Sequence, residues 1–191
     1  MGLMKKLPTY LFLVFFSFSA PSFADDISEY QIEGISIGDS LLDHLSKEEI
    51  ITEIERTRPA YNHLNNDFGE VYLFNNFKNY DYLSFFVKTD DEKFLIYSIR
   101  GSINFTEDMN GCHKKQNELQ EEFSTIFKNA DIQRQEGVKH RADTTGRSYL
   151  DEVKFLFDSG DRITITCYNF EESLRKKNNW QEGLSIGIRT L

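Results

Sequence analysis

Two cysteines, Cys112 and Cys167, are the feature of this 191-residue sequence that most constrains its fold. Cys112 falls near the apolar stripe of a helix predicted over residues 110–130. Cys167 shares the apolar face of a predicted strand with Ile163 and Ile165. Because two independent periodicities direct both sulfurs into one layer, we expect a disulfide that joins this helix to the sheet. Closing a loop of this length contributes about 4 kcal/mol in the chain-entropy description.

The N-terminal segment indicates an oxidising environment for that bond. Lys5 and Lys6 precede the apolar run of residues 11–16, and a small-x-small exit follows. This is the pattern of a secretory signal peptide, and the run is shorter than the about 20 apolar residues of a membrane span. The alternative, a buried N-terminal helix, would alternate polar and apolar faces, and this segment does not. We predict a signal peptide over residues 1–24 and a single α+β domain over residues 25–191. The location is then periplasmic or secreted, with no membrane span after cleavage.

Hydrophobic periodicity predicts both helices and strands. Residues 39–58 form a short helical hairpin, with Asp39 or Ser40 capping its first turn and Ser46 opening its second helix. Predicted strands lie at residues 71–74, 82–88, 94–103, 153–157, 163–168 and 184–188. Each of the longer strands has one apolar face, which is typical of an antiparallel sheet covered on one side. The expected fold class is α+β: an antiparallel β-sheet with an N-terminal helical hairpin and one long helix packed on one face, and one disulfide.

The charge of the chain excludes some classes of partner. Without the predicted signal peptide, which carries two lysines and no acidic residue, the chain has 20 basic and 31 acidic residues, a net charge of −11. Such acidity disfavours nucleic acid and anionic lipid. The four histidines show no spacing typical of a metal site. We therefore expect no nucleic-acid partner, no metal and no cofactor.

A locally basic stretch between the long helix and the last strands is the first candidate for ligand binding. Its candidate residues are Lys139, His140, Arg141, Asp143 and Arg147. The basic side chains can grip a carboxylate or phosphate, and His140 can form a hydrogen-bonded pair with Asp143. The alternative is a solvated connecting loop, although loops carry function disproportionately.

Aromatic residues gather on the predicted hairpin of residues 82–103. They are Tyr80, Tyr82, Phe85, Phe86, Phe94 and Tyr97. We interpret this cluster as core packing rather than as a platform for a sugar or a base.

The segment Gly38-Asp39-Ser40-Leu41 carries a local resemblance. It resembles the nucleophile block of the GDSL esterase/lipase (SGNH hydrolase) family, which implies that Ser40 attacks an ester carbonyl. The Asp-x-x-His pair and the Gly-x-Asn-Asp block that this family also uses are absent from the sequence. A serine without a base is a weak nucleophile. The alternative is that Asp39 or Ser40 caps a helix.

Several blocks spread along the chain carry a second resemblance. They are residues 32–43, Cys112-His113-Lys114-Lys115, Lys139-His140, Asp143, Gly146, Ser159-Gly160-Asp161 and Cys167. In these blocks the chain resembles a group of small exported proteins of marine alphaproteobacteria whose function is unknown. The resemblance implies an exported α+β protein and brings no activity. A helical hairpin followed by an antiparallel sheet is also similar to the architecture of outer-membrane assembly lipoproteins and β-lactamase inhibitors.

These features together predict an exported, non-enzymatic binding or envelope-associated module. The expected partner is an envelope protein or a small anionic ligand. The alternative function is a GDSL-type serine esterase that uses Ser40.

Overall fold

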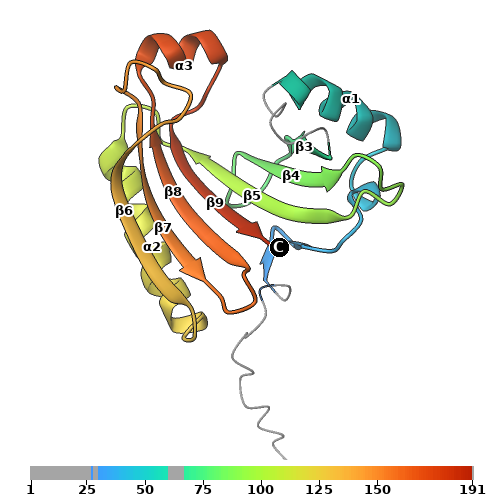
Figure 1. Cartoon of the computed structure of the whole chain (residues 1–191), viewed down its shortest axis with the longest axis horizontal. Coiled ribbons are helices and arrows are strands. Elements are labelled where there is room, and N and C mark those ends of the chain that lie inside the picture. Colours follow the sequence, from blue (N-terminus) through green and yellow to red (C-terminus); the bar gives the residue numbers. More distant parts are fainter. Residues whose placement is uncertain (1–26, 28–29, 60–66, 191) are drawn as a thin grey trace, which may run out of the picture.

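A seven-stranded antiparallel sheet organises the chain (Figure 1). The computed structural model describes Ile27, residues 30–59 and residues 67–190. The predicted signal peptide, residues 1–24, lies outside the described residues. The strands, in spatial order, are β3 (Phe68–Leu73), β4 (Tyr82–Lys88), β5 (Ile96–Asn104), β9 (Gly183–Arg189), β8 (Arg162–Asn169), β7 (Tyr149–Leu156) and β6 (Asp131–Lys139).

The sheet consists of two meanders joined through β9. Strands β3 to β5 follow one another directly, as do strands β6 to β8. The last strand, β9, pairs with both β5 and β8, so Ser185 lies opposite Ser102 on one side and Thr166 on the other. The C-terminal strand β9 therefore joins the two meanders at the centre of the sheet.

The two faces of the sheet differ sharply in chemistry. One row of paired residues crosses five strands and is fully buried: Phe85, Ile99, Ile188, Ile163 and Phe155. The next row points to the opposite face and is mostly polar: Tyr72, Ser84, Arg100, Gly187, Thr164 and Lys154. Because side chains alternate along a strand, this register produces one apolar and one polar face.

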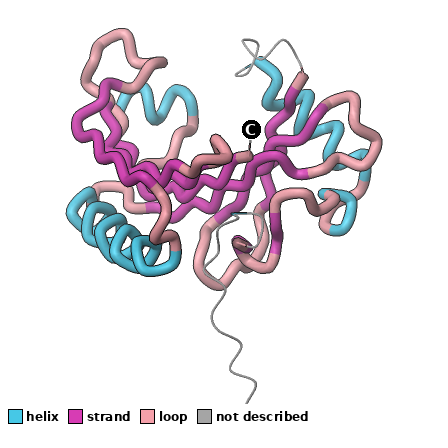
Figure 2. The backbone as a smooth tube through the Cα atoms, turned by 60° about the horizontal axis from the view of Figure 1, so that its bottom comes forward, coloured by secondary structure: helices cyan, strands magenta, loops and turns pink. Residues whose placement is uncertain are grey.

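Helix α2 (Met109–Ile126) covers the part of the apolar face formed by β8 and β9. It begins at Asp108, whose side chain accepts a hydrogen bond from Gly111 N–H at 2.9 Å. Its buried residues are Cys112, Gln116, Leu119 and Phe123, at the spacing of one helix face. Figure 2 shows α2 on one side of the sheet and the short helix α3 (Glu172–Asn178) on the other. Among the residues described, none of the helices has the length and apolar character that crossing a membrane requires.

The predicted fold class is wrong, above all in its N-terminal helical hairpin. The chain instead begins with a small antiparallel hairpin, β1 (Gln31–Ile32) and β2 (Ile35–Ser36), followed by a three-residue 3₁₀ turn (Leu41–Asp43). Gly38 N–H donates to Ile96 O at 2.8 Å, and Leu41 N–H donates to Phe94 O at 3.1 Å. These long-range backbone bonds hold residues 38–41 beside residues 94–96, so the local capping signals start only one turn.

One true helix follows, α1 (Lys47–Thr57), which begins with a capping box between Ser46 and Glu49. It packs against β3, where Gly69 lies so close that a Cβ atom would stand 2.6 Å from Ile54 Cγ1. The sheet is also larger than predicted. Strand β6 was missed because all nine of its residues are exposed, which leaves no apolar alternation to detect.

The predicted disulfide is confirmed. Cys112 on α2 and Cys167 on β8 are bonded, with a Cα–Cα distance of 6.1 Å, and both residues are fully buried. The bond therefore fixes the covering helix to the middle of the sheet and closes a loop between residues 55 positions apart.

Removing this bond will destabilise the fold. In the Cys112→Ala/Cys167→Ala double variant we expect the free energy of unfolding to fall by about 4 kcal/mol, because the unfolded chain regains the entropy of that loop. Urea denaturation followed by circular dichroism measures this difference. As a control, dithiothreitol shifts the urea midpoint of the wild type and leaves that of the double variant unchanged. Equal midpoints for the wild type and the double variant would contradict a stabilising role.

Candidate functional site

A cavity of about 690 Å³ lies over the polar face of the sheet, between the C-terminal ends of α1 and α3. Its floor comes from the central strands β5 and β9, where Ser102 pairs with Ser185 and Arg100 lies beside them on β5. The two serine side chains are small, so they leave space above the sheet. Larger side chains on the flanking strands form the walls. A hollow of this size, with polar groups converging on it, is the common form of a ligand site.

Three aromatic side chains from β3, β4 and the turn between them form the first wall. The ring centroids of Tyr72 and Tyr82 are 5.7 Å apart, and Phe74 stands 5.5 Å from Tyr82 and 6.3 Å from Tyr72. The guanidinium of Arg56 lies 5.4 Å from the centroid of the Tyr72 ring. Phe74 is 67% exposed, which is unusual for a large apolar side chain, so this wall presents an open aromatic surface to the cavity.

The second wall is an aromatic cluster on the opposite side, made of His140, Tyr168, Phe170 and Trp180. The ring centroids of Phe170 and Trp180 are 4.8 Å apart, and His140 is 5.0 Å from each of them. Tyr168 stacks on Phe170 at 5.7 Å. Tyr82 on β4 and Thr166 on β8 share one cross-strand row, so the strands bearing the two walls stand about 14 Å apart.

The end of α3 positions Trp180. Asn179 adopts a left-handed backbone with φ 52°, and Trp180 N–H then donates to Arg175 O at 3.0 Å. Asparagine tolerates this conformation better than most residues, so Asn-Trp at a helix end both stops the helix and turns the indole back over the sheet.

The charged groups of the cavity are paired within the protein. Glu70 is fully buried, with Oε1 3.7 Å from Arg100 Nη1, and its Oε2 accepts a hydrogen bond from the Tyr72 hydroxyl at 2.9 Å. Glu182 accepts from Phe170 N–H at 3.1 Å and stands 3.9 Å from Arg175 Nε. The site therefore offers donors and acceptors without a large excess of either charge.

Of the five predicted loop residues, the structure places His140 alone in the cavity wall. Lys139, Arg141 and Arg147 are exposed, and Arg147 Nη2 lies 3.4 Å from Glu171 Oε1. Asp143 is buried, and its carboxylate takes partners other than the His140 ring. The side chains of this loop do not converge on one point.

Asp143 organises the turn. Its Oδ1 accepts from Thr145 N–H at 2.8 Å and from the Thr145 hydroxyl at 2.6 Å, and its Oδ2 accepts from Ser148 N–H at 2.6 Å. These hydrogen bonds hold the pKa of Asp143 well below its usual range. The carboxylate thus stabilises the loop that carries His140 to the wall.

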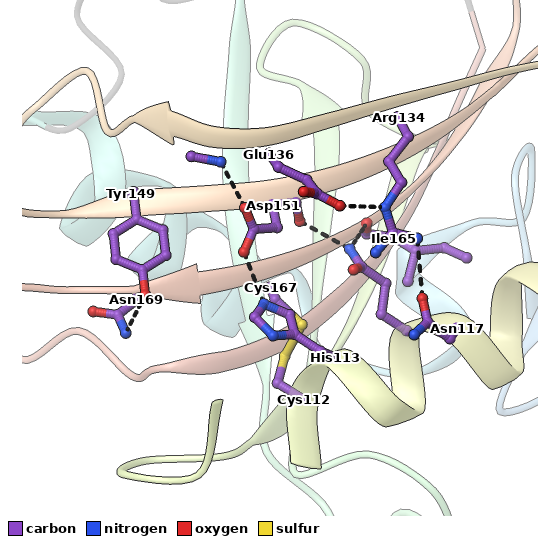
Figure 3. A network of polar contacts seen from close by, with 12 residues as sticks. Cys112, His113, Asn117, Arg134, Glu136, Tyr149, Asp151, Ile165, Cys167 and Asn169 are labelled. Atoms are coloured by element: carbon purple, nitrogen blue, oxygen red, sulfur yellow. Dashed lines mark hydrogen bonds and ion pairs between the residues drawn. A yellow bond between two sulfur atoms is a disulfide. The ribbon is translucent and has the colours of Figure 1, made fainter. Parts of the chain in front are cut away.

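A separate polar network lies on the α2 side of the sheet, beside the disulfide (Figure 3). His113 Nε2 is 2.7 Å from Asp151 Oδ2, and Asp151 Oδ1 accepts from Gly137 N–H at 2.6 Å. Gln116 donates to the backbone carbonyls of Asp151 and Ile165, each at 2.8 Å. Within the described part of the chain, no serine, threonine or cysteine is hydrogen-bonded to His113, so the pair lacks a nucleophile and links α2 to β7 instead.

Neither a metal centre nor an esterase site is assembled in the described residues. They contain no group of three or more His, Cys, Asp or Glu side chains placed to hold a metal ion. Ser40 Oγ donates to Lys93 O at 2.7 Å and accepts from Leu42 N–H at 3.3 Å, and no described histidine or carboxylate is bonded to it. The hydroxyl therefore caps the 3₁₀ turn.

Apart from His140, the sequence analysis did not identify the second wall, and it misassigned one residue of the first. Trp180 and Phe170 lie outside every periodic segment that we identified, and a single tryptophan beside two asparagines was the available signal. Tyr82 had been assigned to core packing with Phe85 and Phe94, whereas only these last two are buried.

Comparisons of the chain with protein-family models, with curated proteins and with solved structures give no match in any of the three.

A fluorophosphonate probe will test Ser40. We expect no covalent adduct on Ser40, because its hydroxyl has a carbonyl as acceptor in place of a base. Intact mass spectrometry measures labelling, with a known serine esterase as the positive control. The Ser40→Ala variant should lose about 1 kcal/mol of stability through the missing cap. An adduct on Ser40 in the folded protein would contradict the capping role.

His140 will make stability depend on pH. Burial of the ring lowers its pKa, and its Nδ1 has no hydrogen-bond partner among the described residues. Below about pH 6.5 the His140 imidazole is protonated more fully in the unfolded state than in the folded state. The free energy of unfolding therefore falls as the pH drops.

Urea unfolding between pH 5 and 8 measures this effect. The His140→Phe variant should show a weaker loss of stability below about pH 6.5. The His44→Gln variant, which removes an exposed histidine, should keep the wild-type profile. If the free energy of unfolding depends on pH in the same way in the wild type and in His140→Phe, the lowered pKa of His140 is contradicted.

Proposed function

We propose that this protein is an exported binding module that holds a neutral, polyhydroxylated ligand of the oligosaccharide class between the two aromatic walls. One observation carries the proposal: a single cavity combines two facing aromatic surfaces with a polar floor whose charges are paired. No complete set of catalytic groups accompanies it among the described residues.

The walls and the floor suit the two kinds of surface that a sugar presents. Aromatic faces such as those of Phe74 and Trp180 pack against the C–H face of a pyranose ring and bury it from water. The hydroxyls of Ser102 and Ser185 and the Arg100–Glu70 pair supply donors and acceptors for sugar hydroxyls. A ligand without charge does not need to displace either ion pair.

Charge favours a neutral ligand over the small anion expected from the sequence. The cavity lining has two arginines, Arg56 and Arg100, and two glutamates, Glu70 and Glu182, so it offers an anion no net positive charge. The chain as a whole has a formal charge of −9, which repels anions. The basic loop residues that prompted the expectation of an anion lie outside the cavity, apart from His140.

An exported location is part of the proposal. The buried Cys112–Cys167 bond supports it, because disulfides persist mainly in oxidising compartments. The predicted signal peptide and the resemblance to small exported bacterial proteins point the same way. Neutral glycans of the cell envelope or the medium would be accessible there.

The chain has one tryptophan, and it lies in the second wall, so tryptophan emission excited beyond the tyrosine absorption band reports on this site. We expect maltohexaose, cellohexaose or chitohexaose to shift the emission of Trp180 in a saturable way. The anionic oligomer hexagalacturonic acid should not. A response to the anionic oligomer alone would overturn the neutral-ligand assignment, and no response to any probe would overturn the sugar class.

Two variants test whether the ligand binds in the cavity. Phe74→Ala removes an exposed ring from the first wall and should weaken binding by roughly three- to tenfold, since one stacked aromatic contributes about 0.5–1.5 kcal/mol. Leu42→Ala removes an exposed apolar side chain from the 3₁₀ turn, outside the cavity, and should leave the affinity unchanged. Equal affinities for the wild type and Phe74→Ala would place the ligand elsewhere.

A further inference from the structure

The two edges of the sheet, β3 and β6, differ in whether their outer backbone groups have hydrogen-bond partners. At the β3 edge, α1 supplies partners for the outer backbone groups: Thr57 Oγ1 donates to Glu70 O at 2.7 Å, and Tyr72 N–H donates to Glu53 Oε2 at 3.3 Å. An edge closed in this way cannot accept another strand without losing these bonds.

The β6 edge is open. All nine residues of β6 are exposed, and apart from the contact of Gly137 with Asp151, no hydrogen bond in the described part of the chain joins its outer backbone to another element. Two of the five large apolar side chains that are exposed among the described residues also lie here, Ile132 at 40% and Val138 at 36%. A long exposed edge is a template for strand addition unless something excludes the incoming strand.

The charges on β6 select one kind of incoming strand. Asp131, Arg134, Glu136 and Lys139 sum to zero, in a chain whose formal charge is −9. If two copies of β6 pair antiparallel about Gln135, Arg134 of each copy lies opposite Glu136 of the other. The two side chains share one face of the strand, since Arg134 Nε is 2.9 Å from Glu136 Oε1 within a single chain. Opposite charges directly across two strands are favourable, and like charges are unfavourable.

The local geometry fixes where this pairing can occur. The register with β7 shifts between Gln135 and Val138, so Glu136 and Gly137 form a bulge opposite Asp151. Gly137 has φ 63°, and its N–H is held by Asp151, which is held in turn by His113. The regular ladder with β7 therefore covers residues 131–135 and resumes at Val138, so Gln135 is the last regular residue and Glu136 meets an incoming strand from the bulge itself.

We propose that β6 is a self-association edge, at which a second copy of this chain adds its own β6 antiparallel about Gln135 and joins the two sheets into one. The contact involves a single strand from each copy, which is small for an interface, so we expect a weak, concentration-dependent dimer.

Sedimentation velocity over a range from about 1 µM to 500 µM tests the pairing. The wild type should shift from monomer to dimer. Arg134→Glu places glutamates opposite each other twice and should weaken the dimer about tenfold or more. Glu136→Arg should do the same while leaving intact the bonds of Arg134 to Asn117 and Gln120. The double variant Arg134→Glu/Glu136→Arg restores opposite charges and should restore dimerisation to within about threefold.

Lys176→Glu on α3 makes a similar change of charge far from the edge and serves as the matched control. Circular dichroism confirms that each variant is folded. In hydrogen exchange, the amides of residues 131–139 should slow at high protein concentration, and those of β3 should not. The proposal is overturned if the wild type stays monomeric or if both single charge reversals leave the dimer unchanged. It is also overturned if protection of the β6 amides requires a separate, added strand-forming peptide and does not depend on protein concentration.

Discussion

The bond between Cys112 and Cys167 is the constraint on which the rest of the structure depends. It holds α2 against β8 and β9 and so decides which face of the sheet is covered. α2 packs on the part of the apolar face formed by β8 and β9, while α1 and the N-terminal hairpin pack on the part formed by β3 and β5. On the opposite face the C-terminal ends of α1 and α3 border the cavity, and the polar rows between them form its floor. The Cys112–Cys167 disulfide thus contributes both to the covering of the apolar face and to the exposure of the polar face.

The distribution of side-chain size across that floor explains where the cavity forms. The central strands β5 and β9 carry serine and glycine there, whereas β4 carries Tyr82 and β8 carries Tyr168. An uninterrupted row of large side chains would fill the face, and an uninterrupted row of small ones would leave it flat. Large residues at the sides and small ones in the middle create a trough whose walls are aromatic. The low pKa of His140 matters here, because a neutral ring at neutral pH extends the aromatic wall without adding charge.

The sequence could predict what depends on local periodicity. Cys112 and Cys167 were placed correctly because helix and strand periods both point inward at these positions. The prediction of an N-terminal helical hairpin failed because the capping signal at Ser40 is local, whereas backbone bonds to residues 94–96 hold Gly38 and Leu41 through contacts distant in sequence. Strand β6 has no apolar face to reveal it. Trp180 gains its neighbours only through tertiary structure. The basic loop was conspicuous by composition, but Asp143 uses its capacity for hydrogen bonds on the turn itself, which composition cannot show.

The proposed binding site and the proposed edge pairing have a joint consequence. Antiparallel pairing of two β6 strands within one sheet places the twofold axis perpendicular to that sheet, so the same face of both copies points in the same direction. Both cavities would then open on one side of a continuous surface. A polymeric ligand with repeated units could bridge them, and the second contact would form at a high effective concentration. Weak affinity at each cavity and weak pairing at the edge would then reinforce each other, because a ligand that spans both sites also favours the paired state. A monomeric sugar offers no such bridge, so on this arrangement chain length, more than the identity of a single unit, would set the apparent affinity.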